Sequence, residues 1–293
     1  MPMPEEITVG PADLGARVWR GGRGRPVLLV HGLSSNARMW DGVAARLAEN
    51  GHPVVAVDLR GHGSSAELPG TGDDDLDNDL DDDLDAVPTD PTRSAAEDLA
   101  AVCADLGWTA PVVAGHAWGG NIALQLAADR PGLVHGLALV DGGWLHLGDQ
   151  FPDLDAAWSV LAPPRFEGVA ERAVRASLRA GHPDWPAGAI EGALSNLRER
   201  ADGSMTPRLE REQHRAIIGS MLRHRPRTLY PLVRCRVLLL AATGDATPVR
   251  KRELLTEAAT ALANAEIVEF HGGDHDLHAH RPVRVAEQIA SLA

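Results

Sequence analysis

The sequence predicts an α/β fold in which a mostly parallel sheet carries helices on both faces. Short runs rich in valine and leucine, bounded by glycine or proline, alternate with longer segments of helical character. This alternation is typical of strand–helix–strand units. Most of the short runs are apolar throughout, as expected for strands that are buried on both faces. With 293 residues and 44% hydrophobic content, the chain can bury one large core and still carry a smaller appended part.

The individual elements follow from these runs in chain order. Six segments are predicted to be strands: Pro26–Val30, Val54–Val57, Val112–Ala114, Leu137–Val140, Val237–Ala241 and Glu266–Phe270. A weaker pattern predicts an early edge strand at Arg17–Arg20. Five helices fit among them: Asn36 or Ala37 to Glu49, Ser94–Leu106, Asn121–Asp129, Val249–Leu262 and Pro282–Leu292. Gly51 and Gly107 follow the first two helices, where a left-handed C-terminal cap is expected.

The strand–helix alternation stops between about Trp144 and Pro231. This stretch contains several aromatic, proline and glycine residues, and its runs Val169–Arg179 and Arg211–Leu222 have an amphipathic pattern. We therefore expect residues 144–230 to form a helical lid, inserted into a core domain made of residues 1–143 and 231–293. Such a lid would govern substrate choice, and its aromatic residues favour an apolar substrate.

The acidic charge is concentrated in one segment. Nine aspartates between Asp73 and Asp85 supply most of the net charge of −13. Negative charge argues against nucleic acid as a partner, because binding the phosphate backbone requires clustered lysine and arginine. The segment lacks the glycine and glutamate that complete an EF-hand calcium loop. We expect residues 72–90 to form a mobile acidic surface loop instead of a cation site.

The location and cofactor content are predicted from what the sequence lacks. Met1–Glu6 has neither the basic start nor the apolar stretch of a secretory signal. No run approaches the roughly 20 apolar residues that span a bilayer. Cys103 and Cys235 lie far apart and without metal-ligand or redox spacing. The expectation is a cytoplasmic protein that binds no membrane and uses neither a metal nor a cofactor.

The segment Val113–Gly120, Val-Ala-Gly-His-Ala-Trp-Gly-Gly, joins a predicted strand to a predicted helix. It has the layout of a nucleophile elbow, in which a sharp turn lifts the central side chain out over the sheet. Gly115 and Gly119 meet the steric requirement of that turn. The central residue is Ala117, which has no nucleophilic atom. Taken alone, the motif also fits a glycine-rich turn that only packs.

Loops at other strand ends carry groups that would complete such a site. The first follows Val30 and reads His-Gly-Leu-Ser-Ser. The backbone N–H of Leu33 in this loop and that of Trp118 could together bind an oxyanion, whereas the side chain of His31 is interpreted as structural. Asp245 follows a buried strand, where α/β enzymes keep ligand-facing residues. A glycine-rich loop after the last strand presents several histidines.

The order of nucleophile position, acid and histidine resembles the α/β-hydrolase fold family, in its group with Gly-His-Ser-x-Gly-Gly elbows. The segment Asp58–Ser65, Asp-Leu-Arg-Gly-His-Gly-Ser-Ser, also matches a loop of that family, interpreted here as structural. The resemblance covers nearly the whole chain outside the acidic segment and the lid. It implies a mostly parallel sheet of about eight strands. It also implies that Ala117 stands at the serine position, Asp245 is the triad acid and His275 is the triad histidine, ahead of His271, His278 and His280.

A triad of this kind hydrolyses a carboxylic ester or lactone through an acyl-enzyme. The predicted partner is therefore a small apolar ester-like molecule, contacted by Ser34 in the first loop and by Trp144 at the pocket mouth. Epoxide-hydrolase or dehalogenase chemistry would instead need an aspartate at position 117. With Ala117 the chain is predicted to be inactive as a hydrolase.

Three interpretations of Ala117 compete. An engineered replacement of serine would trap a substrate, whereas a natural pseudoenzyme would only bind a small molecule. The first is favoured, because a chain released from catalysis would gain by placing glycine at a strained turn. In the third interpretation, His275 and Asp245 act as a general base without a nucleophile, in lyase or cofactor-free oxygenase chemistry.

Overall fold

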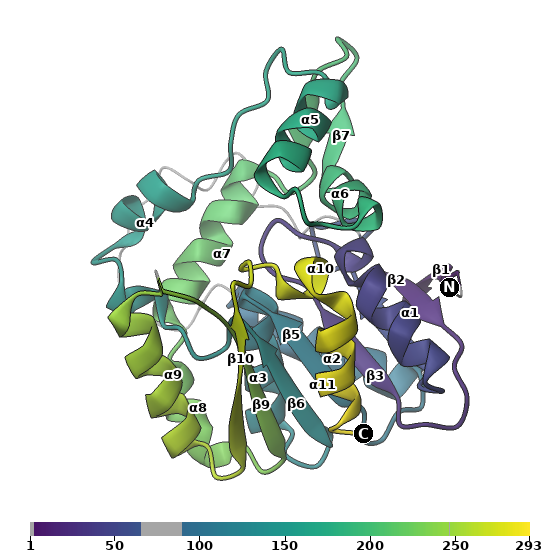
Figure 1. Cartoon of the computed structure of the whole chain (residues 1–293), viewed down its shortest axis with the longest axis vertical. Coiled ribbons are helices and arrows are strands. Elements are labelled where there is room, and N and C mark those ends of the chain that lie inside the picture. Colours follow the sequence, from purple (N-terminus) through teal and green to yellow (C-terminus); the bar gives the residue numbers. More distant parts are fainter. Residues whose placement is uncertain (1–2, 66–89, 246) are drawn as a thin grey trace.

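A computed structural model describes residues 3–65, 90–245 and 247–293 (Figure 1). Its centre is an eight-stranded sheet in the spatial order β1-β2-β4-β3-β5-β6-β9-β10. Only the β1–β2 and β2–β4 pairs are antiparallel, and the other five pairs are parallel. This sheet confirms the predicted fold class. The strands are β1 Glu5–Val9, β2 Leu14–Trp19, β3 Val27–Val30, β4 Val54–Val57, β5 Val112–His116, β6 Gly136–Val140, β9 Arg236–Thr243 and β10 Ala265–His271.

Helices cover both faces of the sheet. One face packs against α1 and α11, and the other against α2, α3 and α9. These helices are α1 Asp41–Glu49, preceded by the 3-10 turn η1 Ala37–Trp40, then α2 Pro91–Asp105, α3 Trp118–Asp129, α9 Val249–Ala261 and α11 Pro282–Ala290. Gly51 and Gly107 end their helices with φ of +90° and +66°, as the sequence predicts. The five predicted helices are therefore all present, within a few residues at their ends.

The N-terminal edge of the sheet differs from the prediction. Strand β1 has no counterpart in the prediction, because only Val9 of its five residues is buried and two others are glutamates. Strand β2 begins three residues before the predicted edge strand Arg17–Arg20. It is also not the edge strand of the sheet, because β1 lies outside it. Its apolar pattern is interrupted by Arg17, which is buried because its guanidinium bonds the carboxylates of Glu6 and Asp41.

Most of the segment between β6 and β9 lies over the carboxyl end of the sheet, the end at which α10 Leu277–His280 also lies, whereas Figure 1 shows its last helix lower down, beside α9. It contains α4 Leu154–Leu161, α5 Glu171–Gly181, α6 Ala187–Leu194, α7 Arg211–Arg223, α8 Pro226–Leu229, the 3-10 turns η2 Leu147–Asp149 and η3 Tyr230–Leu232, and a small sheet of β7 Leu197–Glu199 and β8 Met205–Pro207. Helices α5 and α7 match the two predicted amphipathic runs. That this segment acts as a lid and governs substrate choice stays a prediction.

Two other expectations concern parts of the chain beyond the sheet. The acidic run Asp73–Asp85 lies outside the described residues. Among the helices that the structure describes, none is both long enough and apolar enough to cross a bilayer.

Candidate active site

Ala117 lies at the turn between the central strand β5 and helix α3, with φ of 48° and ψ of −116°. A residue with a Cβ at positive φ is strained, so the surroundings must hold it there. They do so by close backbone packing. A Cβ on Gly115 would lie 2.1 Å from the carbonyl oxygen of Gly119, and a Cβ on Gly142 would lie 2.4 Å from the Cα of Ala117. The turn therefore has the geometry of the elbow that its glycine spacing predicts.

The loop after β3 packs beside the elbow, since a Cβ on Gly32 would lie 3.1 Å from that of Ala117, and both border one cavity. Leu33 and Trp118 both line this cavity, and Trp118 is the first residue of α3. The first N–H groups of a helix have no partner within the helix, and they lie at its positive end. Within the described part of the chain, neither the Leu33 nor the Trp118 backbone N–H donates to another residue. Both amides are thus available to an oxygen atom of a bound molecule.

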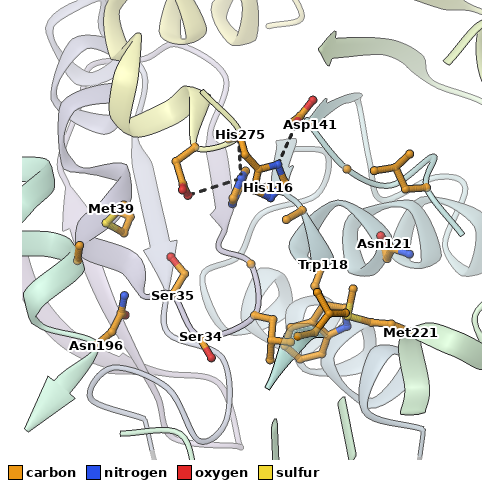
Figure 2. A pocket seen from close by; sticks show the side chains of 18 of the residues that line it. Ser34, Ser35, Met39, His116, Trp118, Asn121, Asp141, Asn196, Met221 and His275 are labelled. Carbon is orange, nitrogen blue, oxygen red and sulfur yellow. Dashed lines mark hydrogen bonds and ion pairs between the residues drawn. The ribbon is translucent and has the colours of Figure 1, made fainter. Parts of the chain in front are cut away.

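His275 also lines the cavity, and its partner is not the carboxylate that the sequence predicts. Its Nδ1 donates to Oδ2 of Asp141 over 2.7 Å, as Figure 2 shows. Asp245, the predicted triad acid, is exposed and makes no side-chain hydrogen bond to a described residue. The loop after β10 returns toward the middle of the sheet, where the ring Nε2 of His116 donates to the carbonyl oxygen of His275. The structure thus places Asp141, at the end of β6, beside His275, and not the predicted Asp245.

Asp141 is a buried carboxylate with three donors. Besides His275, the ammonium of Lys251 lies 2.7 and 2.9 Å from its two oxygens, and the N–H of Ala242 donates to Oδ1. Burial alone would raise the pKa of Asp141, but the hydrogen bonds and charges of His275 and Lys251 outweigh it and lower the pKa. Burial likewise opposes protonation of His275, and the bond to Asp141 outweighs it, so the pKa of His275 rises above 6.5. The pair therefore holds one tautomer of His275, with Nε2 as the free nitrogen.

The cavity has a volume of about 550 Å³ and is lined mainly by apolar side chains from the core and the inserted segment. Ser34 lines it, as expected. Trp144 does not, because its ring is 2% exposed and packs in the main hydrophobic core, while the neighbouring Leu145 and Leu147 reach the cavity. The prediction of Trp144 as a substrate contact is therefore wrong.

Several other histidines near the cavity are engaged within the protein. His31 donates from Nδ1 to the carbonyl oxygen of Gly32 and accepts the N–H of Leu59, so it is structural, as the sequence indicates. Among the described residues, one potential metal-binding group brings His116, Asp276 and His278 together, with ligand atoms within 4.8 Å of one another. His116 already uses Nε2 in its bond to His275.

Comparison with known proteins agrees with this architecture. Residues 25–185, more than half of the chain, match the model of the alpha/beta hydrolase fold. The chain belongs to the α/β-hydrolase fold family.

Individual relatives are similar over shorter stretches. An esterase of Mycobacterium tuberculosis is 36% identical over 141 residues, which cover 48% of this chain and 40% of that protein. A soluble epoxide hydrolase of a Corynebacterium species is 35% identical over 133 residues, 45% of this chain and 40% of that protein. The chain thus matches less than half of the length of either relative. A solved structure of E-2-(acetamidomethylene)succinate hydrolase aligns over 99% of this chain and 98% of its own, with a TM-score of 0.74 and 23% identity, and it shows the shared fold.

Proposed function

We propose that the cavity is the acyl-transfer site of a carboxylic-ester or lactone hydrolase in which Ala117 stands at the nucleophile position. The observation that carries this proposal is the His275–Asp141 bond in the same cavity as the elbow. Asp141 fixes the tautomer of His275, which leaves Nε2 free to act as a base. In this proposal, the N–H groups of Leu33 and Trp118 bind the oxyanion.

The proposed reaction requires a hydroxyl at position 117. A serine there would attack the ester carbonyl while His275 takes its proton, and His275 would then give that proton to the leaving alcohol. Water would then attack the acyl-enzyme while His275 takes its proton, and His275 would return that proton to the serine oxygen as the acid leaves. Ala117 has no oxygen, so no acyl-enzyme forms at this position. The positive φ of Ala117 supports the interpretation that alanine replaces a nucleophilic residue, because glycine would relieve the strain and alanine keeps it.

The cavity and the named relatives support an ester as the substrate class. Its lining is largely apolar and its volume suits a small molecule. One relative is named as an esterase, and the proposal carries that activity to this chain. Another is named as a soluble epoxide hydrolase; covalent opening of an epoxide would use a carboxylate at position 117, which Ala117 lacks just as it lacks a hydroxyl.

The test compares two variants at the same position. Ala117→Ser supplies the hydroxyl, whereas Ala117→Gly relieves the backbone strain without adding a nucleophile. On a panel of short p-nitrophenyl esters, lactones and thioesters, Ala117→Ser should exceed both Ala117→Gly and the parent chain by roughly a thousandfold or more in kcat. Absence of turnover by folded Ala117→Ser on the whole panel would exclude the proposed function.

A further inference from the structure

A serine–histidine pair lies in the same cavity, at a distance from the elbow. The hydroxyl Oγ of Ser34 is 2.9 Å from Nδ1 of His214, a residue of α7 in the inserted segment. Both residues line the cavity. Figure 2 shows Ser34 well away from His275 and Asp141, so the two pairs do not share a side chain.

The hydrogen bonds of His214 determine which nitrogen can accept a proton. Its Nε2 lies 3.0 Å from the carbonyl oxygen of Leu161. A carbonyl oxygen only accepts hydrogen bonds, so Nε2 must carry the hydrogen and Nδ1 of the neutral ring is an acceptor. The hydroxyl of Ser34 therefore donates to Nδ1. This is the arrangement of a nucleophile beside a base that a third group orients.

Both members of the pair are held in place. Ser34 has a φ of 56°, a strained conformation for a residue with a side chain, and its N–H donates to Nε2 of His62. His214 is 4% exposed, and its ring forms a T-shaped pair with that of Trp158 at a centroid distance of 5.8 Å. Burial lowers the pKa of His214, so its ring is neutral at pH 7 and able to accept a proton.

The pair also lies at a junction of two cavities. A second cavity of about 300 Å³ is lined by apolar residues of the inserted segment, among them Phe166 and Val174. Ser34, His214 and Leu161 line both cavities. An ester carbonyl at Ser34 could therefore place its acyl chain in the second cavity and its alcohol portion in the first.

We propose that Ser34 is a nucleophile that accepts an acyl group from small apolar esters, with His214 as its base, in the chain that carries Ala117. Oγ of Ser34 bonds to the carbonyl carbon as its proton moves to Nδ1 of His214. The bond from that carbon to the alcohol oxygen then breaks, and the alcohol leaves with the proton from His214. The product is an ester on Ser34. The hydrogen bond from Nε2 of His214 to the carbonyl oxygen of Leu161 persists throughout the reaction.

This inference rests on the proposed function only for the class of ligand, an ester. It needs neither a hydroxyl at position 117 nor His275. The two proposals therefore fail separately: labelling of Ser34 in the parent chain tests this one, and turnover by Ala117→Ser tests the other.

The experiment treats the parent chain with p-nitrophenyl acetate at neutral pH, quenches with acid, and measures intact mass and peptide masses. We expect one acetyl group per chain, located on Ser34. Ser34→Ala should abolish this adduct, and His214→Gln should slow its formation at least tenfold. Ser35→Ala is the matched control, since Ser35 is the next residue and its hydroxyl has no partner among the described residues. An adduct confined to other residues, or equal labelling of Ser34→Ala and the parent, would overturn the proposal.

A second measurement avoids removal of the base, in case His214→Gln does not fold. Ser34→Cys and Ser35→Cys place a thiol with and without the neighbouring base. A base beside a thiol favours the thiolate, which is the reactive form. The rate of alkylation by iodoacetamide, measured from peptide masses, should be at least tenfold higher for the new thiol of Ser34→Cys than for that of Ser35→Cys. Equal rates would mean that the Ser34–His214 bond only fastens the inserted segment to the core.

Discussion

Replacement of Asp141 by asparagine tests the carboxylate that the structure places beside His275. The side chain of Asp141 is 2% exposed, and it accepts hydrogen bonds from His275, Lys251 and the N–H of Ala242. Asparagine has the same shape but no charge, and it retains one acceptor oxygen. Asp245→Asn is the matched control, since Asp245 is exposed and bonds no described side chain.

The expected loss of stability follows from these contacts. Breaking a buried ion pair by removing one partner costs about 3 to 5 kcal/mol. Lys251 is 20% exposed, so water can solvate part of its ammonium, and asparagine can still accept from Ala242. We therefore expect Asp141→Asn to lower the free energy of unfolding by about 2 to 3 kcal/mol. Asp245→Asn should stay within about 0.5 kcal/mol of the parent.

Two assays measure the effect. Guanidinium unfolding of the parent chain and both variants gives the stability difference. In the background of Ala117→Ser, Asp141→Asn should reduce kcat on the best ester by roughly 10⁴, because the amide cannot hold the required tautomer of His275, while Asp245→Asn should leave it unchanged. The reasoning is refuted if Asp245→Asn causes the larger loss of activity, or if Asp141→Asn changes stability by less than about 1 kcal/mol.

Four further predictions concern the contacts of Asp141 and the packing of the elbow. The rate of ester hydrolysis by Ala117→Ser should decrease as the pH is lowered, with a midpoint that lies above pH 6.5, because His275 must be neutral and Asp141 raises its pKa. Asp141→Asn should move that midpoint to lower pH. Because the pKa of His275 is raised in the folded protein, the His275–Asp141 pair should contribute fully to the free energy of unfolding below pH 6.5, and this contribution should be lost as the pH rises through the raised pKa. Guanidinium unfolding at several pH values would measure this change. Lys251→Met should cost about 2 kcal/mol in guanidinium unfolding, with partial recovery in Lys251→Arg; no change would mean that the ion pair does not form. Gly115→Ala should cost more than about 3 kcal/mol, since its Cβ would meet a backbone oxygen at 2.1 Å, whereas a Cβ on Gly132 meets nothing within 4 Å and that variant should unfold like the parent.

The sequence predicts well whatever depends on local steric rules. The elbow is an example, because the turn leaves no room for a side chain at Gly115 and Gly119, and the structure shows why. The left-handed glycines after α1 and α2 are another. The buried strands are also predictable, since a strand covered on both faces must be apolar throughout.

The errors concern contacts between distant parts of the chain. Asp141 follows the strand β6 just as Asp245 follows β9, so both carry the same local signal. Only the path of the loop that carries His275 brings one of them within hydrogen-bonding distance. The burial of Trp144 depends in the same way on three-dimensional packing. No local pattern marks Lys251 or His214, whose partners lie more than a hundred residues away in the chain.

The central claim is that position 117 and His275 act as one catalytic unit. Its most direct test is a cycle of four chains: the parent, His275→Ala, Ala117→Ser, and Ala117→Ser with His275→Ala, all assayed on one p-nitrophenyl ester. The account predicts that His275→Ala removes nearly all of the rate gained by Ala117→Ser and has little effect on the parent, because groups that act as a unit are strongly non-additive. It is contradicted if His275→Ala reduces the parent and Ala117→Ser by the same factor, which would instead indicate that His275 acts as a base without a nucleophile at position 117.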